Sequence, residues 1–292
     1  MLDFERLAAR PETERMLGIC VSQGGKKIGE FFREEDCRRN LYSASKSYTS
    51  CAVGIAEHEG LLDLSERVVD VFPEEIPAEV NEHLAHATVR DLLTMCLGQD
   101  QAYLMGGQRP LIQDRNWARA GLAEPFVYEP NTCFVYNNVG PYLAGLLVQR
   151  RAGCDLVHYL APRLFEPMGI FMPTWETDPM GNTFGAGGLF LTLREFHRFG
   201  ELYLQGGRWN GKQLVPERWV MESTRKQVEN HTPYGYGYLF WGGPEGSFRA
   251  DGKYGQLSII IRSKDAVVSV LSESRDVPAL QAAIFEEVIE KL

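Results

Sequence analysis

The chain has 292 residues, of which 44% are hydrophobic and 24% are charged, so it is long enough to bury a sizeable core. Its formal net charge is −9 and it has no long basic run, which argues against a nucleic-acid partner. No segment reaches the roughly 18 apolar residues that a membrane span needs. The N-terminus has no secretory pattern, and the six cysteines are scattered without a CxxC pair. We therefore expect a cytoplasmic protein with reduced thiols and no membrane partner, unless an export signal once preceded this sequence.

The predicted elements fall into three stretches along the chain. Residues 18–33 contain two short apolar runs about Gly24-Gly25, which is typical of a β-hairpin. Residues 43–232 follow a mostly helical pattern interrupted by loops. Strands return at "GYGYLFW" (235–241), "SFRADG" (247–252), "QLSIIIR" (256–262) and "AVVSVLSE" (266–273). The chain closes with an amphipathic helix over 277–292, which Asp276 can cap.

These stretches predict an α+β fold, an α/β sandwich, in one catalytic domain over residues 1–292. An isolated hairpin is marginal in water, so we expect it to join the C-terminal strands in one antiparallel sheet flanked by helices. The sheet part would comprise about 1–42 and 233–292, and the inserted helical part about 43–232. The cleft between the two parts is the expected place for a site.

Several kinds of site are disfavoured by the absence of their motifs. None of the six histidines belongs to an HExxH, and His83 and His86 have no third ligand in view. There is no GxSxG elbow and no GxxxxGK[ST] loop, and "GAGG" at 185–188 is not GxGxxG. We therefore expect no metal and no cofactor.

A serine–lysine pair remains, in "NLYSASKSYTSCAVGIAEHEGLLDLSE", where Ser43 and Lys46 form an SxxK motif. The small and apolar residues that follow predict a buried helix. A serine is a weak nucleophile unless a base takes its proton, and a lysine is such a base only when burial or nearby positive charge disfavours its ammonium form. The helix N-terminus would add partial positive charge beside Ser43. A second SxxK, Ser223 and Lys226, lies in a polar stretch, and we interpret it as a chance match.

Two further elements would complete such a site. Tyr136 and Asn138 form the only YxN of the chain, just before another helix. The tyrosine could relay a proton, and the asparagine could bind an acyl group or fix a lysine. Lys253-Tyr254-Gly255 opens a strand, where a cation could depress the pKa of Tyr136 or Lys46 and bind a carboxylate. Gly255 would let the backbone approach a ligand closely.

The order SxxK, YxN, KxG resembles the serine β-lactamase and penicillin-binding-protein superfamily, and most closely its class C β-lactamase and esterase-like branch. "TVRDLLTMCLGQ", "LFEPMGI" and "GAGGLFLTLREFHRFGELYLQGGRWNGKQLVPERWV" also resemble segments of that superfamily. The resemblance implies these roles: Ser43 as acyl-enzyme nucleophile, Lys46 as general base, Tyr136 as second acid/base, Asn138 as a contact to substrate and lysine, Lys253 as electrostatic partner, and the backbone N–H groups of Ser43 and Gln256 as oxyanion hole.

The sequence departs from that family at two places. "TMCLG" at 94–98 stands where His-Thr-Ser-Gly is common, and bulky Tyr254 replaces the threonine or serine that helps to seat a β-lactam carboxylate. Efficient β-lactam turnover is therefore not expected. The segment "GYGYLFWGG" offers four aromatic residues, Tyr236, Tyr238, Phe240 and Trp241. Some of them would line the cleft and favour a short apolar acyl ester as the substrate. The short N-terminal region leaves open a homo-oligomer whose second subunit completes the cleft.

We predict a serine hydrolase that cleaves a small-molecule ester or amide through an acyl-enzyme. The alternatives within enzymes are an amidase or peptidase for D-amino-acid-containing peptides and a weak β-lactamase. An alternative of another class is a binding or sensor protein that is acylated without turnover. A burst without steady-state product release would indicate the sensor.

Overall fold

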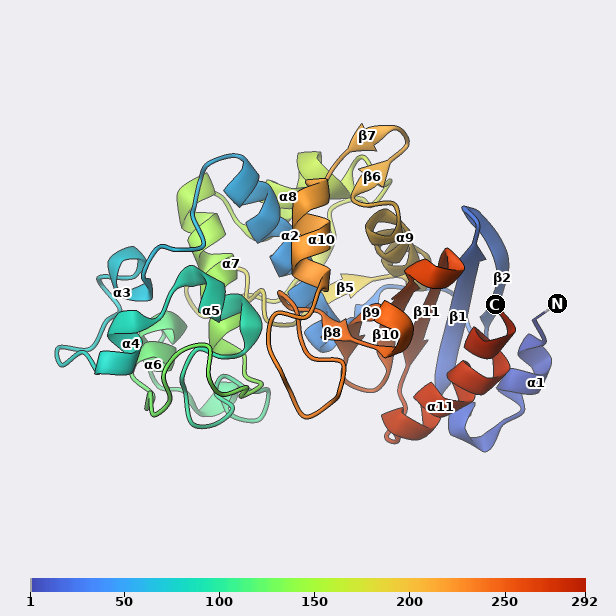
Figure 1. Ribbon diagram of the computed structural model, residues 1–292, viewed down its shortest axis with the longest axis horizontal. Helices are drawn as coiled ribbons and strands as arrows, with labels where there is room; N and C mark the ends of the chain where they lie inside the picture. Colours follow the sequence, from blue (N-terminus) through green and yellow to red (C-terminus); the bar gives the residue numbers. More distant parts are fainter. Residues whose placement is uncertain (1) are drawn as a thin grey trace.

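The computed structural model describes residues 2–292 and is built around a six-stranded antiparallel sheet with strand order β2-β1-β11-β10-β9-β8 (Figure 1). Gly24 and Gly25, with φ of 60° and 70°, form the turn of the predicted hairpin. The N-terminal strand β1 pairs with the C-terminal strand β11, which confirms the predicted joining of the two ends. The strands of this sheet are β1 (Met16–Gln23), β2 (Lys26–Phe32), β8 (Trp241–Gly242), β9 (Phe248–Gly252), β10 (Gln256–Ile261) and β11 (Ala266–Ser272).

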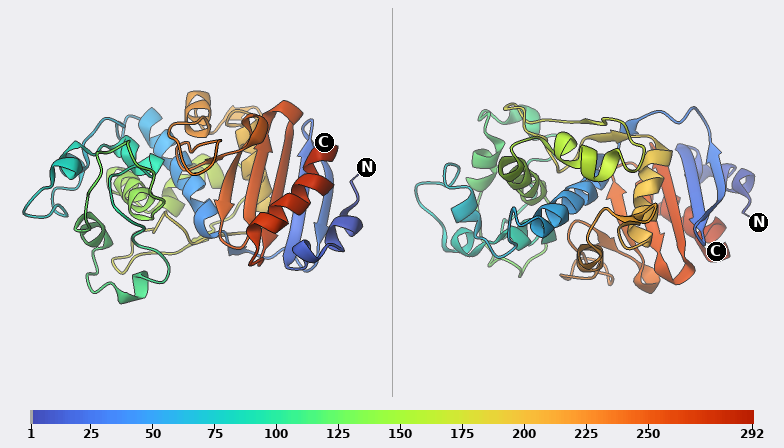
Figure 2. Two further views of the ribbon diagram at one scale, coloured as in Figure 1. Left: turned by 60° about the horizontal axis from the view of Figure 1, so that its bottom comes forward. Right: turned by 90° about the horizontal axis from the view of Figure 1, so that it is seen from above.

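Helices cover both faces of the sheet (Figure 2). The helix α9 (Leu193–Leu204) packs on β10 and β11 from one side, while α11 (Val277–Glu287) and α1 (Phe4–Ala8) lie on the other. Strand side chains alternate between the faces, and every residue of β11 is buried because each face has its own apolar layer. The Asp276 carboxylate accepts a hydrogen bond from the Ala279 N–H, so the predicted cap of α11 is confirmed.

The part between the two strand sets is mainly helical, as predicted, and carries three short strands in a second sheet of order β3-β5-β4. Its central helix α2 (Ser45–His58) runs between this part and the sheet, and it is buried from Ser45 to Ala56. The other elements are α3 (Val68–Val71), α4 (Glu82–His86), α5 (Val89–Thr94), α6 (Trp117–Leu122), α7 (Val139–Ala152), α8 (Leu156–Leu160), α10 (Glu217–Thr224), β3 (Arg39–Asn40), β4 (Thr174–Trp175), β5 (Leu189–Leu191), β6 (Arg208–Trp209) and β7 (Lys212–Gln213).

One predicted strand is wrong. The segment 235–241 is irregular, and regular pairing begins only at Trp241, in β8. The physical reason is Leu239, whose φ of 62° breaks the extended backbone and whose N–H donates to the Leu93 carbonyl of α5. The alternation of glycine and aromatic residues therefore belongs to a tight turn packed on the helical part.

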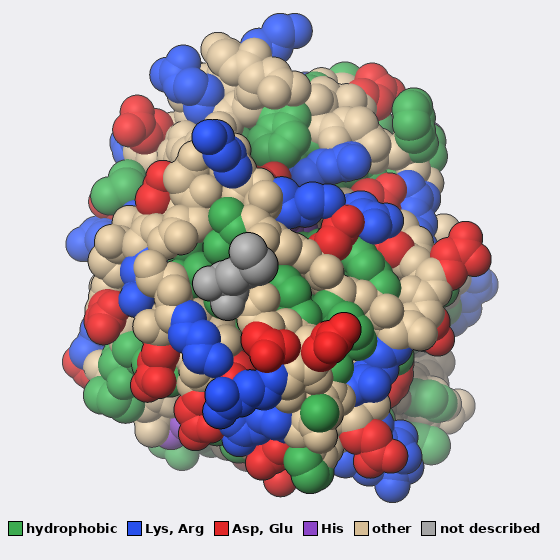
Figure 3. Space-filling model, turned by 90° about the vertical axis from the view of Figure 1, so that its right-hand side faces the viewer, with side chains coloured by type: hydrophobic (Ala, Val, Ile, Leu, Met, Phe, Trp, Pro, Cys, Tyr) green, Lys and Arg blue, Asp and Glu red, His purple; other side chains and the backbone are tan. Residues whose placement is uncertain are grey.

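The face that carries both chain ends presents acidic and basic side chains side by side (Figure 3). Arg6 of α1 pairs with Glu287 of α11, and Arg10, just after α1, pairs with Glu286 of α11. A face with such mixed charge is not the uniformly positive surface that attracts a phosphate backbone. Within residues 2–292 there is also no helix with the length and apolarity that crossing a bilayer requires.

Candidate active site

The candidate nucleophile lies on a tight turn at the start of the buried helix. Ser43 is the middle residue of a 3-10 turn, η2 (Tyr42–Ala44), and α2 continues directly from it. The turn is set up by Asn40, whose side-chain oxygen accepts the Tyr42 N–H at 2.7 Å, with Tyr42 at φ 47°. Ser43 therefore stands at the N-terminal end of a 14-residue helix, where backbone N–H groups and partial positive charge favour a developing oxyanion.

Lys46 lies one turn further on and points at Ser43. Its Nζ is 3.0 Å from Ser43 Oγ, 2.7 Å from Asn138 Oδ1 and 2.6 Å from the Ala186 carbonyl oxygen. The side chain is 1% exposed, and burial, helped by the positive charge of Arg109, lowers its pKa from 10.5 to about 7. As a neutral amine, Lys46 keeps two N–H bonds for the two carbonyl oxygens and turns its lone pair to the Ser43 hydroxyl. The arrangement can therefore accept the serine proton.

Tyr136 and Asn138, the predicted YxN pair, both reach this lysine. The Lys46 Nζ lies 5.1 Å from the centroid of the Tyr136 ring, and that ring stacks on Trp241 at 5.4 Å. Burial raises the pKa of Tyr136 and a hydrogen bond with Ser43 opposes the shift, so the phenol is protonated at neutral pH. Asn138 accepts a hydrogen bond from Lys46 through Oδ1, and its Nδ2 donates one to the Leu104 carbonyl oxygen. Of the two roles predicted for Asn138, this contact is the one to a lysine.

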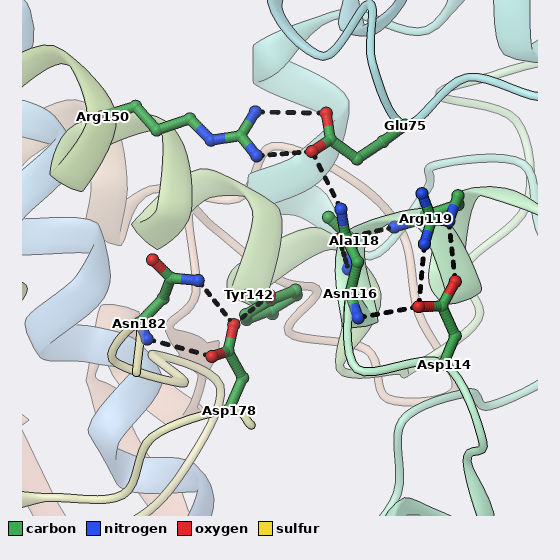
Figure 4. Close-up of polar contacts among 9 residues, drawn as sticks. All are labelled: Glu75, Asp114, Asn116, Ala118, Arg119, Tyr142, Arg150, Asp178 and Asn182. Carbon is green, nitrogen blue, oxygen red and sulfur yellow. Dashed lines mark hydrogen bonds and ion pairs between the residues drawn. The ribbon is translucent and has the colours of Figure 1, made fainter. Parts of the chain in front are cut away.

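Asn138 is held in place by the anchoring of the helix that follows it. Asn138 is the N-terminal flanking residue of α7, and two side chains of α7 are tied to surrounding loops (Figure 4). Arg150 forms a double hydrogen bond with the buried Glu75 at 2.5 and 3.2 Å, and the Tyr142 hydroxyl donates to Asp178 at 2.6 Å. Buried charge-assisted contacts of this kind stabilise one position of the helix, and with it the position of Asn138.

The structure does not bring the third predicted motif to the lysine in the expected way. Lys253, Tyr254 and Gly255 form the turn between β9 and β10, and Lys253 is exposed with its Nζ 4.7 Å from the Tyr254 ring centroid. Within the described residues no hydrogen bond joins Lys253 to Ser43, Lys46 or Tyr136. The low pKa of Lys46 comes from burial and from the charge of Arg109. The pKa of Tyr136 is raised by burial. The prediction that Lys253 lowers the pKa of Lys46 or Tyr136 is therefore wrong.

A glycine outside the predicted motifs touches the turn that carries Ser43. A Cβ on Gly252 would lie 2.1 Å from the Leu41 carbonyl oxygen and 3.1 Å from the Ala44 nitrogen. A Cβ on Gly255 would instead meet Leu280 of α11. Gly252, at the end of β9, therefore makes a close approach to this turn that the sequence did not predict, whereas the close approach of Gly255 to a ligand stays a prediction.

Two further predicted residues, Tyr254 and Gln256, lie near the turn that carries Ser43, and their roles toward a substrate stay predictions. The Tyr254 ring packs edge-on against Tyr42, 5.4 Å between centroids, next to Ser43. The Gln256 side chain donates to the Lys253 and Ser272 carbonyl oxygens and so braces the β9–β10 turn, while its backbone N–H remains a predicted oxyanion donor.

The predicted aromatic wall is reduced to one residue. Tyr236, Tyr238 and Phe240 are each no more than 2% exposed and belong to the core, whereas Trp241 is half-buried beside Tyr136. The second SxxK is not a site, because Ser223 is fully buried and Lys226 pairs with Glu229 on the surface.

Two residues that act on Lys46 were not predicted from the sequence, Arg109 and Ala186. The glycines of "GAGG" signalled a close backbone approach around Ala186, but nothing in the 99–116 loop singled out Arg109.

Comparison with known proteins agrees with this geometry. The Beta-lactamase family model matches residues 9–289. The chain belongs to the Beta-lactamase family. Over 270 residues, it is 26% identical to the 6-aminohexanoate-dimer hydrolase of Paenarthrobacter ureafaciens, covering 84% of this chain and 67% of that one. Members of this family are serine hydrolases, and the chain is a hydrolase of this kind.

Solved structures share the fold along nearly the whole chain. A candidate 6-aminohexanoate-dimer hydrolase from Bacillus anthracis has a TM-score of 0.82 at 19% identity, covering 99% of this chain and 82% of that one. A penicillin-binding protein from Bacillus halodurans has a TM-score of 0.75 at 17% identity, covering 97% and 99%. At such low identity these likenesses establish the Beta-lactamase-family fold, which confirms the predicted architecture.

Proposed function

We propose that this Beta-lactamase-family hydrolase cleaves a small ester or amide through an acyl-enzyme on Ser43. The observation that carries the proposal is the buried Lys46 amine, 3.0 Å from Ser43 Oγ and with a pKa near 7. The Ser43 oxygen attacks the substrate carbonyl carbon while its proton passes to Lys46. The carbonyl oxygen becomes an oxyanion beside the Ser43 backbone N–H. The leaving group departs with a proton, and the acyl group stays on Ser43.

The second half of the reaction runs the same groups in reverse. Water attacks the acyl carbonyl carbon and gives a proton to the base, and the bond from that carbon to Ser43 Oγ breaks as the serine regains a proton. Tyr136 is a proton donor at neutral pH, because burial raises the pKa of its phenol. We assign it the delivery of the proton to the leaving group.

An amide substrate is the second candidate, and the 26% identical relative favours it because that protein is named for hydrolysis of a 6-aminohexanoate dimer, whose units an amide joins. Amidase activity on D-amino-acid-containing peptides belongs to the same candidate. Steady-state assays with p-nitrophenyl esters and the matching p-nitroanilides separate ester from amide preference. A single acylation burst with no steady-state turnover on either series would support the sensor alternative.

The deciding experiment maps a covalent adduct. Incubation with a fluorophosphonate should add one label, and peptide mapping should place it on Ser43. Ser43→Ala should lose the label and reduce turnover by on the order of 10³-fold or more, because residues that act as a unit fail together. Ser223→Ala is the matched control and should keep the label. A label on any residue other than Ser43 would remove the basis of the proposal.

A further inference from the structure

Arg109 is a cation that borders the site and has few partners of its own. It begins the short 3-10 turn η3 (Arg109–Leu111), and its guanidinium lies 4.4 Å from the centroid of the Phe184 ring. Glu176 is its one polar partner within the described part of the chain, with Nη1 3.2 Å from Oε2. The buried Nε has no acceptor, and the side chain is 24% exposed. A guanidinium has five N–H bonds, so most of its donor capacity is unused.

The same short segment connects Arg109 with the proposed base. Residues 184–188 place the Phe184 ring under Arg109 and the Ala186 carbonyl oxygen on Lys46, 2.6 Å from Nζ. Glu176 is attached to this segment by its N–H, which donates to Gly188, and a Cβ on Gly188 would clash with it. Arg109 and Lys46 therefore both contact residues 184–188, Arg109 through the Phe184 ring and Lys46 through the Ala186 carbonyl oxygen.

The ion pair is also joined to the nucleophile turn by hydrogen bonds. Glu176 Oε1 accepts from Asn40 Nδ2 at 3.2 Å, and Asn40 Oδ1 accepts the N–H of Tyr42, the residue before Ser43. The Arg109 loop meets the site a second time at Leu104, whose carbonyl accepts from Asn138. Arg109 is thus joined through Glu176 and Asn40 to the turn that carries Ser43, and its loop contacts Asn138.

We propose that Arg109 binds a carboxylate on the acyl side of the substrate, so that the preferred substrate is an acid-bearing ester or amide. This inference rests on the proposed function and names its substrate class. Glu176 accepts from a single nitrogen of Arg109, at 3.2 Å. A substrate carboxylate would offer two oxygens side by side, which can accept two N–H groups of the guanidinium at once. Phe184 and Trp117 hold the guanidinium plane, which limits the entropy lost on binding.

Two matched substrates test the inference: the p-nitrophenyl half-ester of adipic acid, and p-nitrophenyl hexanoate, in which a methyl group replaces the carboxylate. The wild type should show a higher kcat/KM for the adipate half-ester. Arg109→Met should reduce the adipate-to-hexanoate ratio at least about tenfold, mainly through KM, because a charge-assisted contact is lost. Arg109→Lys should recover part of the ratio. Arg119→Met, at an exposed arginine paired with Asp114, is the control and should leave the ratio unchanged.

A second variant separates substrate binding from a merely structural ion pair. Glu176→Gln keeps hydrogen-bonding groups beside Asn40 and Arg109 but removes the negative charge that competes with the substrate carboxylate. It should raise the adipate-to-hexanoate ratio, opposite to Arg109→Met. If both variants lower kcat/KM for the two esters by equal factors, the pair only positions the turn and the inference is overturned. If Ser43→Ala still hydrolyses both esters, the proposed function fails instead.

Discussion

Within residues 2–292 no carboxylate pairs with Lys46, and its amine is held by two carbonyl oxygens and the Ser43 hydroxyl. Burial without a counter-ion makes the ammonium form costly, and the nearby Arg109 adds to that cost. The result is an amine that is partly neutral at physiological pH. An ordinary surface lysine would be almost wholly protonated there and could not take a proton from a serine.

The pH dependence of activity should report this amine. Because neutral Lys46 is the proposed acceptor of the Ser43 proton, log kcat/KM should rise with a slope near one up to about pH 7 and then level off. Initial rates with a p-nitrophenyl ester between pH 5 and pH 9 measure it. A rising limb centred near pH 10 would show that Lys46 titrates like an exposed lysine.

Two substitutions decide which cation acts on the amine. Arg109→Met removes the positive charge that helps to lower the pKa of Lys46, so the limb should move to higher pH. Lys253→Met should move it less, because Lys253 is exposed at the β9–β10 turn. The two pH profiles, recorded under the same salt conditions, provide the comparison. A larger shift for Lys253→Met would restore the role that the sequence predicted for it.

The free energy of unfolding should also depend on pH because of Lys46, and the direction of the change is fixed. Between about pH 7 and pH 10.5 the unfolded chain binds a proton on Lys46 that the folded chain does not, so the free energy of unfolding rises with pH. Relative to Lys46→Met, the wild type should gain about 1.4 kcal/mol per pH unit in that window. Urea titrations of both proteins at pH 7.5 and 9.5 measure the difference. A pH-independent difference would mean that the buried amine keeps its proton.

At the scale of elements, the site depends on how closely β9 approaches the turn η2. Only a residue without a Cβ fits at position 252, because the Leu41 carbonyl and the Ala44 nitrogen occupy the space where a side chain would begin. This contact joins the end of the strand β9 to the turn η2, which leads into α2. It sets the position of Ser43 relative to the sheet.

Gly252→Ala should therefore displace the nucleophile turn. A shift of about 1 Å at a reacting group costs on the order of 10²-fold in rate, so we expect a loss of kcat of at least that size. Gly107→Ala is the matched control, since a Cβ there has nothing within 4 Å and the backbone needs no positive φ. Steady-state rates and circular dichroism of both variants test this. Full activity in Gly252→Ala would show that β9 and η2 do not constrain each other.

At the scale of the whole molecule, the sheet and the helical part share one apolar core. A single cluster of buried residues runs from Cys20 of β1 through α2 and α7 to Leu271 of β11. The predicted single domain over 1–292 should accordingly unfold in one cooperative transition, although the chain is long. Far-ultraviolet circular dichroism, tryptophan fluorescence and residual activity in urea should give coincident curves. Activity that disappears in a separate, earlier transition would indicate that the helical part unfolds independently.

The sequence by itself determined the architecture and the central pair of the candidate site. Hydrophobic periodicity, the Gly24-Gly25 turn and the Asp276 cap are local signals, and the structure reproduces the elements that they predict. Ser43 and Lys46 meet because a spacing of three residues puts them on one helix face. Asn138 was found through its motif and through the order of the three motifs along the chain.

Only the tertiary structure decided which groups surround that pair. Arg109 and Glu176 come from a loop and a strand end 67 residues apart, and no local pattern marks either of them. The KxG motif predicted that Lys253 acts on Lys46 or Tyr136, but Lys253 is exposed at the turn between β9 and β10. The contact of Gly252 with the turn at Ser43 had no signal in the sequence. Tyr236, Tyr238 and Phe240 alternate like a strand and yet fill the core, because Leu239 adopts a positive φ. Such outcomes depend on contacts between segments distant in the chain, which residue order does not specify.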